Sequence, residues 1–239
     1  MANTLRGETA FERRTPKVLI VPGIDNSGPD HWQTHWENNR DDCQRVDLGM
    51  WDQPHRNTWV NKLNLAIHQA DAPVVLVAHS LGVVTVAWWA EYEQPRYGGP
   101  VVGALLVAPP DIERPGLDER LAKFGACPRT PLPFPSFLAA SRNDPYCPFR
   151  TSISLARDWG SRFVDAGEIG HINARSDIGD WQEGQHFLER LLREHHAAAT
   201  FSEEAWGNGY ARTASVPPSA WERRGRTNRR STWRRDAAA

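Results

Sequence analysis

The stretch Pro73-Val-Val-Leu-Val-Ala-His-Ser-Leu-Gly82 decides the fold, and helix-forming residues follow it at once as far as Ala90. A buried strand, a sharp turn with an exposed serine and a following helix together make a nucleophile elbow. The usual motif is G-x-S-x-G, and in this chain Ala78 replaces the first glycine. Small residues are needed there because the turn brings the strand and helix backbones close together. Since alanine adds only one methyl group, we expect the turn to form, which makes Ser80 a candidate nucleophile.

Apolar strands and helical segments alternate along the rest of the globular sequence. The expected strands are 17–21, 44–48, 73–79, 101–108, 136–140 and 161–165. The expected helices are 31–37, 58–70, 81–94, 151–159 and 181–195, with Asp30 as the predicted N-cap of the first. This order predicts an α/β fold with a mostly parallel sheet of about six strands. Strands that are apolar throughout fit a sheet with helices on both faces.

The segment between the fourth and fifth expected strands is an excursion from this alternation. Residues 109–135 are rich in proline and glycine around a short helical piece, 117–124. Such composition is typical of a loop. We therefore expect a rim or, at most, a small cap over a site.

The composition bounds the class of protein. With 239 residues, 40% of them hydrophobic, the chain can bury one core of good size. The polar residues 1–15 lack the apolar run of a signal peptide and predict a flexible arm ahead of a domain over 16–196. No window approaches the roughly 18 apolar residues of a membrane helix, so we expect no membrane insertion. Three widely spaced cysteines imply no disulfide framework, and we expect reduced thiols in a cytoplasmic protein.

The formal net charge of -1 argues against a general polyanion binder but conceals an asymmetry. Residues 197–239 contain more arginines than acidic residues, which leaves the globular part mildly acidic. Low apolar content and clustered positive charge predict a disordered basic tail there. Arginine interleaved with Trp221 and Trp233 also suits nucleic acid or an anionic surface, and this reading stays the less favoured alternative.

Three residues that can carry nucleophilic catalysis follow three of the expected strands. Ser80 follows strand 73–79, Asp144 follows strand 136–140 and His171 follows strand 161–165. Open α/β sheets place their sites at these carboxyl ends, and Ser…Asp…His is the chain order of α/β-hydrolases. A serine hydroxyl needs an imidazole to take its proton, and a carboxylate fixes the tautomer of that imidazole.

The oxyanion of a tetrahedral intermediate requires backbone N–H donors. The N–H of Leu81, directly after the candidate nucleophile, is one expected donor. The second is expected in the loop after the first strand, where we favour the N–H of Ile24. Asp25, Asn26 and Ser27 of the same loop either line the substrate pocket or make the turn. His79 and Pro109 are the remaining pocket candidates.

Four motifs support a resemblance to a known family: PGIDNSGPDHWQTHWE, AHSLG, SRNDPYCP and GHIN…SDIGDW. Together they resemble the small serine hydrolases related to retinoblastoma-binding protein nine, the YdeN-like family, over about residues 16–195. The resemblance implies a compact α/β-hydrolase fold without the first two strands of larger members, and no metal or organic cofactor. It also implies a catalytic triad of Ser80, Asp144 and His171. The N-terminal arm and the basic tail match nothing in the family pattern.

Several residues have competing interpretations. Asp111, after strand 101–108, rivals Asp144 as the partner of a histidine, and Asp144 itself could serve an Asx-turn. His31 and His35 have the i, i+4 spacing of metal ligands, but no third ligand is obvious, so helix packing is favoured. Cys147 lies three residues after Asp144. It is interpreted as a buried small hydrophobic residue in preference to a redox site.

The sequence thus predicts a metal-independent serine hydrolase that cleaves a small carboxylic ester or thioester through an acyl-enzyme on Ser80. The alternative is a binding or adaptor protein that keeps the hydrolase frame around a vestigial site. The intact set of Ser80, Asp144 and His171 favours the enzyme. The substrate's acyl chain length and the oligomeric state are not specified by these motifs.

Overall fold

The computed structural model describes residues 14–116 and 118–207, with side chains described as far as Ala198. The chain divides into two compact units, Met1–Ser202 and Glu203–Ala239, and the sheet lies wholly in the first. Most of the predicted arm, 1–13, and the greater part of the predicted basic tail, 208–239, lie outside the described residues. Within the described part of the chain, no helix is both long and apolar enough to cross a membrane.

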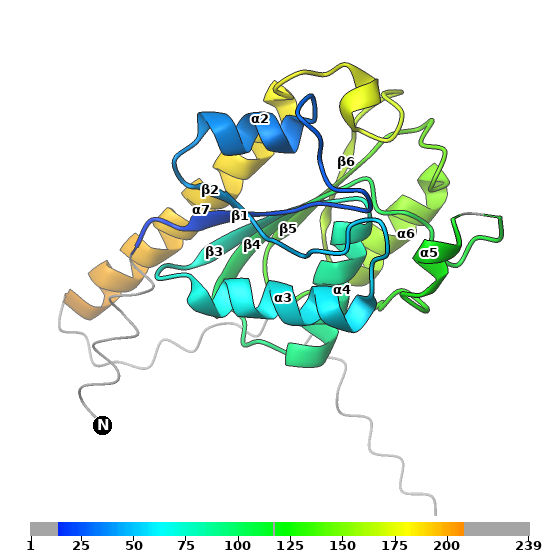
Figure 1. Ribbon diagram of the computed structural model, residues 1–239. Helices are drawn as coiled ribbons and strands as arrows, with labels where there is room; N and C mark the ends of the chain where they lie inside the picture. Colours follow the sequence, from blue (N-terminus) through cyan, green and yellow to red (C-terminus); the bar gives the residue numbers. More distant parts are fainter. Residues whose placement is uncertain (1–13, 117, 208–239) are drawn as a thin grey trace, which may run out of the picture. The chain divides into compact units, whose positions relative to one another are not determined.

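Six parallel strands form one sheet in the order β2-β1-β3-β4-β5-β6 (Figure 1). The strands are β1 (Lys17–Val21), β2 (Cys43–Arg45), β3 (Val74–His79), β4 (Val101–Val107), β5 (Ser136–Ala140) and β6 (Arg162–Asp165). The helices are α2 (Trp32–Asn39), α3 (Arg56–Gln69), α4 (Leu81–Glu93), α5 (Glu119–Ala122), α6 (Phe149–Trp159), the 3-10 helix η1 (Ala174–Ser176) and α7 (Gln182–Gly207). The predicted α/β fold with a parallel sheet and flanking helices is confirmed.

Alternate residues of each inner strand enter different cores, because successive side chains of a strand point to opposite faces. Val18 and Ile20 of β1 belong to the core that α2 and α7 cover, whereas Leu19 and Val21 belong to the core beneath α3, α4 and α6. Figure 1 shows α2 and α7 on one side of the sheet and α3 and α4 on the other. Burial on both faces explains why the strands read as continuous apolar runs.

The strand order reverses direction between β1 and β3. The chain runs from β1 outward to β2, returns to β3 on the other side of β1, and continues outward to β6. Loops on the two sides of such a switch point diverge and leave a crevice at the carboxyl ends of the strands. The loop after β1 and the turn after β3 border this crevice, which places Ile24 and Ser80 next to it.

Three local expectations differ from the structure. Asp30 does not cap α2; the helix begins one residue later than expected, and the imidazole of His31 accepts a hydrogen bond from the Gln33 N–H. Strand β2 covers only Cys43–Arg45. The apolar residues that made it look longer, Val46 and Leu48, are buried beyond its end.

The ends of the predicted domain also differ in detail. Arg14, inside the predicted flexible arm, donates a hydrogen bond to the Asp71 backbone oxygen at 2.8 Å. Helix α7 continues past the predicted boundary at 196 as far as Gly207. Residues 197–207 of the predicted tail belong to this helix, and the prediction for residues beyond 207 concerns residues that the structure does not describe.

Candidate active site

The turn after β3 holds Ser80 in a strained backbone conformation. Its φ is 53° and its ψ is -126°, in the half of φ/ψ space that non-glycine residues seldom enter. A Cβ on Gly82 would lie 2.3 Å from the Val21 carbonyl oxygen, so only glycine fits there. Ala78 is fully buried between β1 and β4, where its methyl group is accommodated. The turn therefore tolerates Ala78 in place of the first glycine of the motif. The close approach of the backbones requires glycine only at Gly82.

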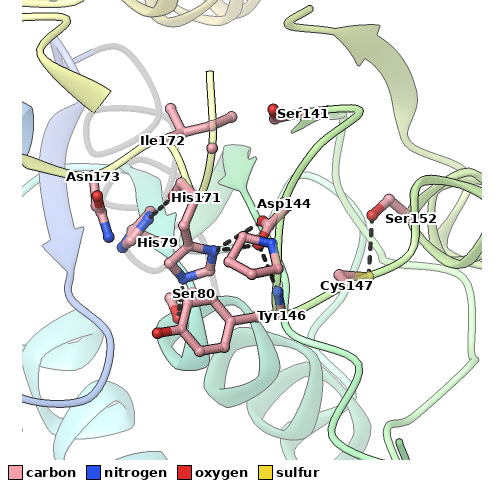
Figure 2. A network of polar contacts seen from close by, with 12 residues as sticks. His79, Ser80, Ser141, Asp144, Tyr146, Cys147, Ser152, His171, Ile172 and Asn173 are labelled. Atoms are coloured by element: carbon pink, nitrogen blue, oxygen red, sulfur yellow. Dashed lines mark hydrogen bonds and ion pairs between the residues drawn. The ribbon is translucent and has the colours of Figure 1, made fainter. Parts of the chain in front are cut away.

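A continuous hydrogen-bonded chain joins Ser80, His171 and Asp144 (Figure 2). The Ser80 Oγ lies 2.9 Å from the Nε2 of His171. The Nδ1 of His171 lies 2.8 Å and 3.0 Å from the two carboxylate oxygens of Asp144. The side chains of His171 and Asp144 are 9% and 3% exposed, so water competes little for these bonds. The arrangement is consistent with a catalytic triad.

Asp144 makes the contacts that both of its interpretations require. Its Oδ1 accepts a hydrogen bond from the Tyr146 N–H at 2.9 Å, which is an Asx-turn contact, while the same carboxylate bonds to His171. The rival carboxylate, Asp111, accepts a hydrogen bond from the hydroxyl of Thr151 at 3.3 Å instead. The structure therefore pairs His171 with Asp144.

Two side chains of other elements hold the loop that carries His171 by hydrogen bonds to its backbone carbonyls. The His79 Nε2 donates to the backbone oxygen of His171 at 2.9 Å. The indole N–H of Trp32, in α2, donates to the next carbonyl, that of Ile172, at 2.8 Å. Their contribution to the site was not predicted, although His79 was a pocket candidate and Trp32 stands in one of the quoted motifs.

A second pair of contacts ties the histidine loop to the aspartate loop. The Oδ1 of Asn143 accepts the Gly170 N–H at 2.7 Å, and the Oγ of Ser141 accepts the Ile169 N–H at 2.9 Å. Ser141 and Asn143 precede Asp144 in the SRND motif, and Ile169 and Gly170 precede His171. Polar residues of one motif thus fix the backbone of the other, which sets the distance between the two ionisable side chains.

Two further histidines beside His171 are held neutral. The ring centroids of His31 and His79 lie 4.7 Å apart, and those of His79 and His171 lie 4.9 Å apart. Burial lowers the pKa of His31 to about 3, with smaller electrostatic contributions from Arg45, His171 and His35. Burial also lowers the pKa of His79 well below its usual value. Because Nδ1 of His31 accepts a hydrogen bond, its proton is on Nε2, which has no hydrogen-bond partner among the described residues.

The loop after β1 presents an N–H group that makes no hydrogen bond within the described part of the chain. In the described structure, neither the Ile24 N–H nor the Leu81 N–H donates a hydrogen bond to another residue. Asp25 and Asn26 follow with φ values of 61° and 62°, an uncommon pair of left-handed residues. Arg45 of β2 supports this turn by donating to the Asn26 side chain at 3.0 Å. Free, fixed N–H groups beside the serine are what an oxyanion hole needs.

A cavity of about 330 Å³ opens at this edge of the sheet. Of the expected pocket residues, Asp25, Asn26 and His79 line it, together with Ser80 and His171. Two expected pocket residues do not: Ser27 is buried and bonds to Gln33 at 2.7 Å, and the neighbour of Pro109, Pro110, takes its place. The lining residues that sequence reasoning missed are Gly28, His31, Asp118, Arg120, Leu121, Tyr146, Asn173, Ala174 and Arg175.

The excursion after β4 forms one rim of this cavity. Arg120 of α5 forms ion pairs with Asp25 at 2.9 Å and with Asp118 at 2.6 Å. This contact joins the excursion to the loop after β1, as a rim and not as a separate cap. Cys147 does not reach the cavity; it is buried, contacts Ser152 at 3.2 Å, and burial raises its pKa to about 11.

The parallel sheet, the strained serine after β3 and the paired histidine and carboxylate after β6 and β5 define an α/β-hydrolase. The model of a family described as Serine hydrolase matches residues 18–190. The chain therefore belongs to this serine hydrolase family, as the sequence motifs predicted.

Solved structures agree with this assignment. A protein from Pectobacterium atrosepticum described as a YdeN-like hydrolase is 32% identical, with a TM-score of 0.64 over 83% of this chain and 99% of that chain. The ydeN gene product from B. subtilis is 21% identical and shares the fold, with a TM-score of 0.55 over 77% of this chain and 100% of that chain. Est1E from Butyrivibrio proteoclasticus, solved with ferulic acid bound, is 14% identical, with a TM-score of 0.55 over 76% of this chain and 90% of that chain. No curated protein sequence matches the chain.

Proposed function

We propose that the protein hydrolyses a small carboxylic ester or thioester through an acyl-enzyme on Ser80. The observation that carries the proposal is the chain of hydrogen bonds from Ser80 Oγ through His171 to Asp144, at 2.9 Å and 2.8 Å. A serine at φ 53° has no structural reason to stay in that conformation unless its hydroxyl is used. A vestigial binding protein would not need this geometry.

The first half of the reaction forms the acyl-enzyme. Ser80 Oγ attacks the carbonyl carbon of the substrate while Nε2 of His171 takes the hydroxyl proton. Asp144 holds the Nδ1 proton of His171, so Nε2 is free to accept, and it stabilises the imidazolium that forms. The negative charge on the former carbonyl oxygen is directed to the N–H groups of Ile24 and Leu81, each worth roughly 3–4 kcal/mol.

Collapse of the tetrahedral intermediate breaks the bond to the leaving group. His171 gives its proton to the departing oxygen or sulfur, which leaves as an alcohol or a thiol. In the second half, His171 takes a proton from water, and the resulting hydroxide attacks the acyl carbon. The same proton then returns to Ser80 Oγ as the carboxylic acid is released.

The size of the cavity favours a small substrate. A volume of about 330 Å³ is near the lower end of small-molecule sites, which span roughly 300–1,000 Å³. Apolar side chains of Ile24, Pro110 and Leu121 line one part of it and suit a short acyl group. The Arg120 ion pairs close the rim beside Asp25.

The experiment that tests the proposal combines labelling with turnover. A fluorophosphonate probe is expected to label the wild type and Ser154→Ala, a matched serine variant on α6, but not Ser80→Ala. A chain-length series of p-nitrophenyl esters and acyl thioesters, run on the same three proteins, identifies the preferred acyl group. Asp144→Asn should lower kcat by about 10³–10⁴ because His171 loses its correct tautomer. Correctly folded wild type that is neither labelled nor active on the series would refute the proposal.

A further inference from the structure

Two arginines line the cavity, and one of them is fully occupied by protein partners. The guanidinium of Arg120 donates from Nε, Nη1 and Nη2 to the carboxylates of Asp25 and Asp118 and to the backbone oxygen of Asp52. These contacts use all the N–H donors of the guanidinium, so none is left to bind a ligand. Arg120 therefore fixes the rim, and it also neutralises the acidic side chains on that side.

Arg175 is different, since its side chain has no partner among the residues that the structure describes. In the described part of the chain, its guanidinium forms no hydrogen bond and no ion pair, and the residue is exposed. Its backbone, by contrast, is fixed: Asn173 Oδ1 accepts the Arg175 N–H at 3.0 Å, and the Asn173 N–H donates to Ser176 Oγ at 3.1 Å. This capping box fixes the start of the 3-10 helix η1. The backbone of Arg175 is therefore held in place, while its guanidinium makes no hydrogen bond or ion pair with the other described residues.

The guanidinium charge of Arg175 belongs to the same loop as His171. Arg175 is four residues after His171 and lines the same cavity as Ser80. It also lines a neighbouring cavity of about 380 Å³, which shares Tyr146, His171 and Asn173 with the first. The centroids of the Tyr146 and His171 rings lie 4.5 Å apart, and both residues line the two cavities together with Arg175.

The other charges near the site do not neutralise Arg175. Asp25 and Asp118 are paired with Arg120, and Asp144 is bonded to His171. Glu168 lines the neighbouring cavity but forms no ion pair with Arg175. His31 and His79 are neutral, because burial lowers the pKa of each. Arg175 is thus the uncommitted cation among the described charged residues that line the cavity.

We propose that Arg175 binds a carboxylate carried by the substrate, so that the preferred substrates are anionic esters or thioesters. The inference rests on the proposed hydrolase function and adds the charge of its substrate class. A guanidinium pairs with a carboxylate through two parallel N–H donors, a geometry that a neutral ester cannot satisfy. The carboxylate can belong to the acyl part or to the leaving group, and the test has an arm for each.

The test compares matched pairs of esters that differ only in a carboxylate. Mono-p-nitrophenyl succinate against p-nitrophenyl butyrate places the charge in the acyl part, and 4-acetoxybenzoate against its methyl ester places it in the leaving group. For one of the pairs, the wild type should favour the anionic ester in kcat/KM. Arg175→Ala should lower that preference about 2- to 5-fold, the range measured for exposed ion pairs.

Two controls separate a specific contact from a general effect of charge. Arg96→Ala removes the same charge from the loop between α4 and β4, at the opposite edge of the sheet, and should leave the preference and the activity unchanged. Raising NaCl from about 0.02 M to about 0.5 M should reduce the preference of the wild type but not that of Arg175→Ala. Arg175→Lys should keep part of the preference because it keeps the charge without the planar fork.

The outcomes distinguish this inference from the proposed function. If the wild type cleaves the neutral esters but Arg175→Ala and wild type show equal preference in both pairs, the anion site is refuted and the hydrolase function stands. If Arg175→Ala lowers kcat/KM of both members of each pair equally, the anion site is also refuted. If Ser80 is unlabelled and no ester is cleaved, the hydrolase function is refuted and the anion site falls with it.

Discussion

The imidazole of His79 donates a hydrogen bond to the backbone oxygen of His171, with 2.9 Å between Nε2 and the oxygen. His79 directly precedes Ser80, so one residue of the serine turn positions the loop that carries the histidine. His79 is 5% exposed, and its lowered pKa keeps it neutral. The relative position of Ser80 and His171 thus depends on a bond from the side chain of His79 to the backbone of His171, and not only on the contact between the two side chains.

Replacement of His79 by leucine is expected to lower kcat about 10- to 100-fold with little change in KM. The side chain of leucine fills the site but donates no hydrogen bond, and displacement of a catalytic group by about 1 Å has effects of this size. His79→Gln retains an N–H donor and should recover part of kcat. The measurements are steady-state kinetics and the pH profile of kcat/KM. Equal activity of the leucine and glutamine variants would show that the bond has no positioning role.

Trp32→Phe should reduce both stability and activity, whereas Trp36→Phe should reduce stability alone. Each variant keeps an aromatic ring but removes an indole donor, at 2.8 Å to Ile172 O for Trp32 and 2.8 Å to Asp180 O for Trp36. A buried carbonyl without its donor costs about 1–3 kcal/mol, measured as the free energy of unfolding in urea, and this applies to Ile172 O. Asp180 O keeps a hydrogen bond from Gln185 Nε2 at 3.2 Å, so Trp36→Phe should cost less. Only the Ile172 carbonyl adjoins His171. An equal loss of kcat in the two variants would contradict this assignment.

Gly82→Ala is expected to prevent folding of the elbow, and Gly28→Ala to have little effect on stability. A Cβ at position 82 would meet the backbone oxygens of Val21 and Pro22 at 2.3 Å and 2.6 Å, which are backbone atoms that cannot rotate away. A Cβ at Gly28 would have nothing within 4 Å. Thermal unfolding and fluorophosphonate labelling measure the difference. A folded and labelled Gly82→Ala protein would mean that β1 and α4 can separate without loss of the site.

Stability is expected to fall as the pH drops below about 6.5. His31 and His79 have lowered pKa values in the folded protein, so the unfolded chain binds more protons than the folded one over this range. The free energy of unfolding therefore rises with pH, by about 1.4 kcal/mol per pH unit for each histidine while it is charged only in the unfolded chain. His31→Asn keeps a capping side chain and should reduce the slope between about pH 4 and 6 by that amount. Identical slopes for the variant and the wild type would rule out His31 as a source.

The fold could be predicted because its determinants are local and periodic. The apolar run of β3 and the elbow sequence that follows it fix a strand, a turn and a helix without reference to distant residues. The positions of Asp144 and His171 after β5 and β6 then place them at the same edge of a parallel sheet as Ser80. The partnership of the three could be inferred from chain order, because parallel strands bring their carboxyl ends together.

The remainder depends on contacts that leave no pattern in the sequence. Arg120 and Asp25 are 95 residues apart, and their pairing follows from the path of the excursion, which its proline and glycine content does not specify. Asp30 was the better N-cap on residue type, but the helix starts one residue later and His31 takes that role. Val46 and Leu48 are buried but lie outside the sheet. In the sequence, a buried apolar residue outside a strand cannot be distinguished from one inside it.

The conformation of Ser80 also bears on how this chain can change over time. A residue held at φ 53° and ψ -126° raises the free energy of the folded state by about 1–3 kcal/mol, and glycine at the same place avoids most of that strain. The substitution that abolishes the nucleophile is therefore one that should make the protein more stable. At this position selection for stability would favour glycine and selection for hydrolysis would favour serine, so the two act in opposite directions.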